Sequence, residues 1–282
     1  MRHPEVFTPK KLIDRRTAVV ITNHLGATVT NHRGQRGHTG REAQAIADAS
    51  GRQVIAYDRP GTGVRRNKQL AAELRAHPDV ARRQWASEVR TVAQDSGARQ
   101  VHLLSRSAGS DFLLAVAASG DLPLVSAICA VEPMSILPRT GLRGEGRYAF
   151  YQHYDEGRFA EERPKFTTEK RDWRETLDML RRQGVDIAHN RPAWKSDIAY
   201  SSARHIAEIL FSMPALLVFA QLPLAGPREK IEQLTAGLTT LRRPEDAPFA
   251  VEFIPKTTHG SFEDPALYID QYAKLAQLAF ID

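Results

Sequence analysis

A short apolar segment that ends in a serine-containing turn and continues as an apolar helix constrains this chain most. Residues 101–104 predict a buried strand and residues 111–118 a buried helix, with the turn Ser-Arg-Ser-Ala-Gly-Ser between them. Ser107 has small residues two places before and after it, Ser105 and Gly109. We expect Ser107 to sit on a strained corner with its hydroxyl exposed, beside backbone N–H groups at a helix N-terminus.

A second turn of small residues follows an earlier predicted strand. Residues 53–57 are apolar, and Asp-Arg-Pro-Gly-Thr-Gly follows at residues 58–63. We expect Asp58 to anchor this turn through hydrogen bonds from its side chain to the backbone. Residues 17–22 are another apolar run, typical of a strand that is buried on both faces. Such runs, alternating with helical segments, predict an α/β fold with a parallel sheet.

The two turns, in this order, resemble those of the α/β-hydrolase family. The segment around Ser107 is similar to the G-x-S-x-G nucleophile elbow, with Ser105 in place of the first glycine. Residues 58–63 are similar to the D-x-x-G-x-G turn of the same family. The resemblance covers nearly the whole chain and implies a mostly parallel eight-stranded sheet with helices on both faces.

The resemblance also implies two domains. The segment 134–209 is rich in charged and aromatic residues and has helical periods but no clear strand. It lies where the family inserts a helical cap, so we expect a core of residues 1–133 and 210–282 and a cap of residues 134–209. The alternative is one more packed helical layer, and we expect most of the aromatic residues in this segment to serve packing.

Candidate catalytic residues come from the same resemblance. Ser107 matches the nucleophile, and His259, in the loop after the last predicted strand at residues 249–254, matches the catalytic histidine. The backbone N–H groups of Ala108 and Leu25 are the expected donors to an oxyanion. Gly26 is the alternative donor and, in the same loop, a candidate for substrate binding.

The acid of the triad departs from the family pattern. Family members often place it after the strand that corresponds to residues 215–220, but Gln221 follows that strand here and no acidic residue occurs before Glu229. Glu132 stands at the end of a neighbouring predicted strand, where open α/β sheets bind their ligands. We therefore expect Glu132 to orient His259, with a buried ion pair to an arginine as the alternative.

These assignments imply a serine hydrolase that cleaves an ester, thioester, lactone or amide of a small molecule. Arg106, next to Ser107, is a candidate for binding an anionic substrate group, with a structural ion pair as the alternative. The fold also hosts acyltransferases, lyases and inactive relatives. A non-catalytic binding protein is thus the main alternative, favoured by the replaced elbow glycine and by the missing acid after residues 215–220.

Composition and motifs limit the kinds of partner and cofactor that we expect. The net charge is +6, but the arginines form scattered pairs without interleaved aromatic residues, so we do not expect nucleic-acid binding. Cys129 is the only cysteine and lies in an apolar run, which predicts a core residue and no disulfide. No cofactor motif or metal-ligand spacing occurs. Without a targeting segment or an apolar run of membrane length, we expect a cytoplasmic protein that does not bind membranes, and a homodimer is compatible with the sequence.

Overall fold

The computed structural model describes residues 4–22, 29, 36–60, 62, 77–137, 202–223, 225–243 and 245–279. The strands are β1 (Glu5–Phe7), β2 (Asp14–Thr22), β3 (Arg52–Tyr57), β4 (Gln100–Arg106), β5 (Val125–Val131), β6 (Ala215–Leu222) and β7 (Phe249–Thr258). The helices are α1 (His38–Ser50), α3 (Pro78–Asp95), α4 (Ala108–Ser119), α7 (Ser202–Ile209), α8 (Arg228–Thr240), the 3-10 helix η1 (His259–Glu263) and α9 (Pro265–Ala279).

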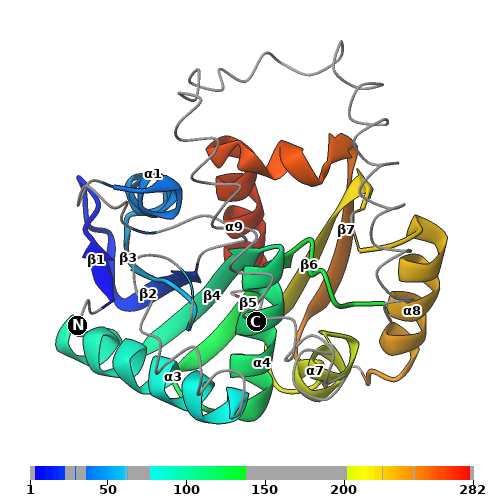
Figure 1. The fold of residues 1–282 in the computed structure, drawn as a ribbon, viewed down its shortest axis with the longest axis horizontal. Coiled ribbons are helices and arrows are strands. Elements are labelled where there is room, and N and C mark those ends of the chain that lie inside the picture. Colours follow the sequence, from blue (N-terminus) through cyan, green and yellow to red (C-terminus); the bar gives the residue numbers. More distant parts are fainter. Residues whose placement is uncertain are drawn as a thin grey trace.

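The described strands form one seven-stranded sheet in the order β1-β3-β2-β4-β5-β6-β7 (Figure 1). β1 pairs antiparallel with β3, and every other pair is parallel. The predicted fold class is therefore confirmed, although the described residues supply seven strands where eight were expected. Because β2 to β7 run in one direction, their last residues gather along one border of the sheet, which we call the carboxyl edge; the opposite border is the amino edge.

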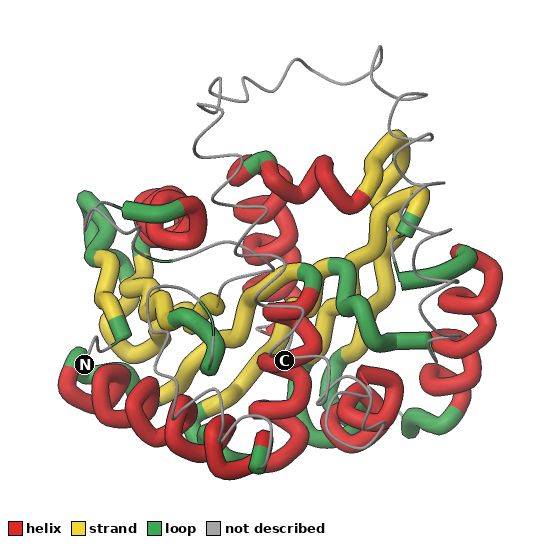
Figure 2. The backbone as a smooth tube through the Cα atoms, viewed as in Figure 1, coloured by secondary structure: helices red, strands yellow, loops and turns green. Residues whose placement is uncertain are grey.

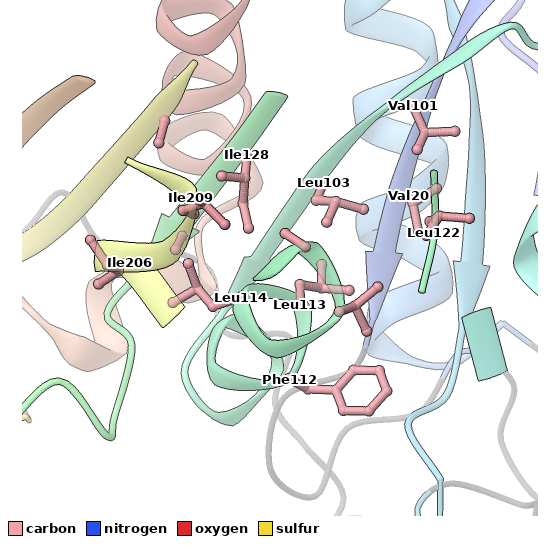
Figure 3. Close-up of a cluster of buried hydrophobic side chains, with 14 of the residues drawn as sticks. Val20, Val101, Leu103, Phe112, Leu113, Leu114, Leu122, Ile128, Ile206 and Ile209 are labelled. Carbon is pink, nitrogen blue, oxygen red and sulfur yellow. The ribbon is translucent and has the colours of Figure 1, made fainter. Parts of the chain in front are cut away.

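Helices cover both faces of the sheet (Figure 2). One buried apolar cluster joins the sheet to α3, α4, α7 and α8, and a second joins it to α1 and α9. Figure 3 shows part of the first cluster, where Leu103 and Ile128 from the sheet meet Leu114 of α4 and Ile206 of α7. The central strands are buried on both faces, which explains their nearly continuous apolar sequences.

Two sequence expectations about the core can be compared with this arrangement. Cys129 is buried and not in a disulfide, as predicted, and burial raises the pKa of its thiol. The expected cap over residues 134–209 lies mostly outside the described residues. Its last segment forms α7, which packs against α4 and contributes Ile206 and Ile209 to the core.

None of the described helices combines the length and the apolar character needed to cross a membrane. Within the same residues, no group of three or more histidine, cysteine and acidic side chains is arranged to hold a metal ion.

Candidate active site

Ser107 occupies the corner between β4 and α4. Its backbone has φ 56° and ψ −136°, in the left-handed half of conformational space that residues with a β-carbon rarely adopt. Its N–H donates to the carbonyl of Val131 at 2.8 Å, which ties the corner to the end of β5. The strained corner is therefore as predicted. The exposed hydroxyl is not, because Ser107 is only 4% exposed at the end of a central strand, where its neighbours enclose it.

The small residues around Ser107 are held by hydrogen bonds. Ser105, which replaces the expected glycine, is fully buried and donates through Oγ to the carbonyl of Thr22 at 3.1 Å. The hydroxyl of Ser110 lies 2.6 Å from the carbonyl oxygen of Ser105 and 2.9 Å from that of Val131. The serine at position 105 thus fits the crowded turn, since its hydroxyl has an acceptor at the end of β2.

Glu132 and His259 meet at the carboxyl edge. Glu132 directly follows β5, has φ 50° and is 0% exposed. One carboxylate oxygen accepts a hydrogen bond from the N–H of Ala220 near the end of β6. The other, Oε2, lies 3.4 Å from Nδ1 of His259, slightly beyond the range of about 2.6–3.2 Å expected for a formed catalytic hydrogen bond. The structure therefore joins two predicted site residues that are 127 positions apart in the sequence.

Local structure fixes the position of His259 in the chain between β7 and η1. β7 ends at Thr258, and η1 starts at His259. The side chains of Thr258 and Ser261 each bond the backbone of the other residue, forming a capping box that includes a 3.0 Å bond from the Thr258 N–H to Ser261 Oγ. These bonds hold the turn together from Thr258 to Ser261. The direction of the His259 side chain therefore follows from the path of the backbone at the end of β7.

Arg106 belongs to a buried polar cluster under α1. Its guanidinium lies 3.1 Å from Glu42 Oε1, and both side chains are 5% exposed. Nε2 of His38 lies 2.8 Å from the same guanidinium and 3.1 Å from Glu42 Oε1. Burial by itself would raise the pKa of Glu42, but the charges of Arg106 and His38 outweigh burial and hold this pKa below its usual value. The geometry favours the structural ion pair over a role for Arg106 in binding substrate.

The candidate oxyanion donors are only partly placed. Ala108 is the first residue of α4, so its N–H has no acceptor within the helix. Leu25 and Gly26 lie outside the described residues. Asp58 accepts a 2.9 Å hydrogen bond from the N–H of Val29, which links the turn after β3 to the segment after β2. The predicted anchoring role of Asp58 is confirmed, with its partner in a different segment from the turn itself.

Asp111 and Gln221 are two further polar residues at this edge whose contacts sequence reasoning did not predict. Asp111, in the first turn of α4, accepts hydrogen bonds from the N–H and the hydroxyl of Ser135 at 3.0 and 3.1 Å. It thereby ties the helix to the segment that follows Glu132. An acidic residue in a first helical turn ordinarily suggests only stabilisation of the helix, so no sequence signal points to Ser135. Gln221 was noted only as the residue found where an acid was expected.

No protein-family model matches the sequence, and no curated protein does. Solved structures match along nearly the whole chain. Proline iminopeptidase from Mycobacterium smegmatis is 16% identical with a TM-score of 0.59, over 98% of this chain and 94% of that one. A membrane phospholipase A, a bacterial virulence factor, is 14% identical with a TM-score of 0.61, over 99% and 87%. MGS-M2, an α/β hydrolase enzyme from a deep-sea metagenome library, is 13% identical with a TM-score of 0.55, over 98% and 94%. At these identities the likeness shows the fold.

Proposed function

From the α/β-hydrolase fold of this chain, we propose that the protein is a serine hydrolase with Ser107 as nucleophile, His259 as base and Glu132 as acid. The observation that carries the proposal is the 3.4 Å contact between Glu132 Oε2 and His259 Nδ1 at the edge where Ser107 follows β4. A serine hydroxyl becomes a useful nucleophile only when a base removes its proton, and the base needs an acceptor that fixes its tautomer.

The geometry supports a separate role for each nitrogen of the His259 ring. With Nδ1 directed at Glu132, Nε2 of His259 is the nitrogen that takes the Ser107 proton as the serine oxygen attacks the substrate carbonyl carbon. The protonated histidine then gives this proton to the leaving group, which departs as the acyl-enzyme forms. In the second half of the reaction, His259 takes a proton from water as the water oxygen attacks the acyl carbon. The bond from that carbon to Ser107 Oγ then breaks, the protonated His259 returns its proton to Ser107, and the carboxylic acid leaves. The N–H of Ala108 is one donor to the oxyanion, and a donor of this kind contributes about 10²–10³ in rate.

Each carboxylate oxygen of Glu132 has a partner of its own. A carboxylate removed from water is stable only when hydrogen bonds replace its hydration. The Ala220 N–H bonds Oε1, which leaves Oε2 for the histidine. The Ala220 N–H belongs to β6, the strand after which family members more often carry the acid. In this proposal the acid has the same role, but it approaches His259 from the end of the adjacent strand, β5.

The substrate we propose is an ester, thioester, lactone or amide of a small molecule. Structures with the same fold include a proline iminopeptidase, an arylesterase and a phospholipase A, and these names support a hydrolytic activity. The buried pairing of Arg106 with Glu42 argues against using that guanidinium for an anionic substrate group.

A fluorophosphonate probe tests the proposal, because it reacts covalently with an activated serine. We expect labelling of the wild type at Ser107, found by peptide mass spectrometry, and none in Ser107→Ala at an unchanged thermal midpoint. Labelling at Ser105 or Ser110 instead would refute the assignment. A folded wild type that is not labelled would favour the non-catalytic alternative, and acyl transfer to an added alcohol without hydrolysis would favour an acyltransferase.

A further inference from the structure

β7 carries an irregularity opposite the end of β6. Ala220 pairs with Ile254, and Leu222 pairs with Thr258. One residue of β6, Gln221, therefore lies opposite three residues of β7, 255–257. Such a bulge bends a strand and redirects the side chains that follow it. His259 is the first residue after this strand, so the bulge sets the path of the chain into His259.

Gln221 holds the bulge from both its side chain and its backbone. Its Oε1 accepts a 2.6 Å hydrogen bond from the N–H of Lys256. Its own N–H donates to Thr257 Oγ1 at 3.3 Å, and that hydroxyl donates to the carbonyl of Ile254 at 2.7 Å. Lys256 has φ 55°, a conformation that a residue with a β-carbon adopts only when its surroundings enforce it. The Gln221 amide is one such enforcing contact.

Two consecutive residues near the end of β6 thus act on the two partners of one contact. The N–H of Ala220 holds Oε1 of Glu132, and the next residue, Gln221, holds the bulge that leads to His259. The separation between Glu132 and His259 depends on both. Gln221 stands where an acid was expected from the family pattern, and its side chain accepts a hydrogen bond from the backbone of β7, the strand that leads into His259.

We propose that Gln221 is a positioning residue that fixes the Lys256 bulge and thereby places His259 against Glu132. This inference rests on the proposed function, because its measured effect is on the reactivity of Ser107. Gln221 itself touches neither the nucleophile nor the reacting atoms; it acts through the backbone of β7.

The first test compares variants of Gln221 by the kinetics of fluorophosphonate labelling. Gln221→Met removes the acceptor at nearly constant length, and Gln221→Asn keeps the amide but shortens its reach. Both should lower the maximal labelling rate by about ten- to a hundredfold, the size of effect expected when a catalytic group is displaced by an ångström or less. The probe concentration for half-maximal rate should change little. Gln221→Glu retains an acceptor for the Lys256 N–H and should keep most of the rate.

A rescue experiment separates positioning from general destabilisation. Glycine adopts φ 55° without the steric cost of a β-carbon. Lys256→Gly should therefore favour the bulge even without the hydrogen bond to Gln221 Oε1. In the Gln221→Met background, Lys256→Gly should restore much of the labelling rate. Lys256→Ala also removes the lysine side chain but keeps the steric cost of a β-carbon at this φ, so it should not restore the labelling rate.

The outcomes distinguish the two claims. If the wild type is not labelled, the proposed function fails and this inference fails with it. If the wild type is labelled at Ser107, the inference is overturned in two cases: the Met and Asn variants react at the wild-type rate, or their loss is recovered equally by Lys256→Gly and Lys256→Ala. Thermal melting of each variant, measured by circular dichroism, confirms that the folded protein is being compared.

Discussion

The two edges of the sheet differ in which residues adopt left-handed backbone. At the carboxyl edge, three residues with side chains, Ser107, Glu132 and Lys256, have positive φ, in addition to Gly226 between β6 and α8. At the amino edge, where helices end and the next strands begin, glycines have this conformation: Gly51 after α1, Gly97 after α3 and Gly120 after α4. In the part of the chain that the structure describes, no other residue with a side chain has positive φ.

The difference reflects what each edge has to do. At the amino edge the backbone only has to leave a helix and enter a strand, so the residue with the least steric cost is sufficient. In the proposed mechanism the carboxyl edge must also present the hydroxyl of Ser107 and the carboxylate of Glu132, and both residues have positive φ. Each such residue costs on the order of 1–3 kcal/mol, which the surrounding packing must offset. Strain borne by residues with functional groups therefore marks the candidate site more sharply than any single motif.

Removing the acid should have the largest effect at the carboxyl edge. Glu132→Gln keeps an oxygen for the Ala220 N–H but places an amide where His259 needs an acceptor, so kcat for an ester substrate should fall by about 10³–10⁴-fold. Glu252→Gln provides the matched control, because that carboxylate, on β7, pairs with Lys274 of α9. Equal activity of the two variants would remove Glu132 from the mechanism.

Acid should act on stability through groups outside the site. Burial, followed by the charge of Arg52, lowers the pKa of His102 from its usual 6.5 to about 4, and burial similarly lowers that of His205 to about 4. Below pH 6.5 the unfolded chain binds these protons before the folded protein does. The free energy of unfolding should therefore fall between pH 6.5 and 4, by up to roughly 3 kcal/mol per histidine, and level off above pH 6.5.

Urea unfolding at pH 7 and pH 4.5 measures this dependence. His102→Asn removes one titrating group, whose Nδ1 lies 3.1 Å from the hydroxyl of Tyr272, so the variant should lose less stability on acidification than the wild type does. An identical loss in both proteins would mean that His102 does not contribute.

At the amino edge, glycine replacement should reduce stability without affecting chemistry. A β-carbon on Gly51, at φ 65°, would lie 2.5 Å from Cδ1 of Ile13, so Gly51→Ala should cost about 2–4 kcal/mol. Gly120, at φ 67°, has open space around it, and Gly120→Ala should cost only about 1 kcal/mol. Denaturant titration ranks the two costs. Fluorophosphonate labelling of the folded variants should match the wild type, and a large loss of labelling would show that the two edges are not independent.

The smallest expected effect concerns strain at the nucleophile itself. Ser107→Ala and Ser107→Gly both remove the hydroxyl, but only glycine is free of the β-carbon penalty at φ 56°. Ser107→Gly should therefore be more stable than Ser107→Ala, by about 1 kcal/mol in thermal or urea unfolding. Equal stability would mean that the corner carries no strain.

Much of the fold could be predicted from the sequence. The buried strands follow from short apolar runs, and the helix after Ser107 follows from the apolar residues 112–118 and from Gly120, which ends it. The strained corner follows from the small residues around it. The expected strand at 249–254 was too short: β7 continues to Thr258, because the bulge at Lys256 lets pairing with β6 resume beyond the apolar run.

The sequence by itself, through local motifs that resemble those of the α/β-hydrolase family, indicated which residues could carry the chemistry, since such motifs span only a few neighbouring positions. Only the tertiary structure decided the partners of the polar side chains: Glu42 for Arg106, the N–H of Val29 for Asp58, and the N–H of Lys256 for Gln221. The contact of Glu132 with His259 was proposed from the sequence, but its distance depends on strand order, register and a bulge. These features are set by packing summed over the whole sheet, and no local segment contains that sum.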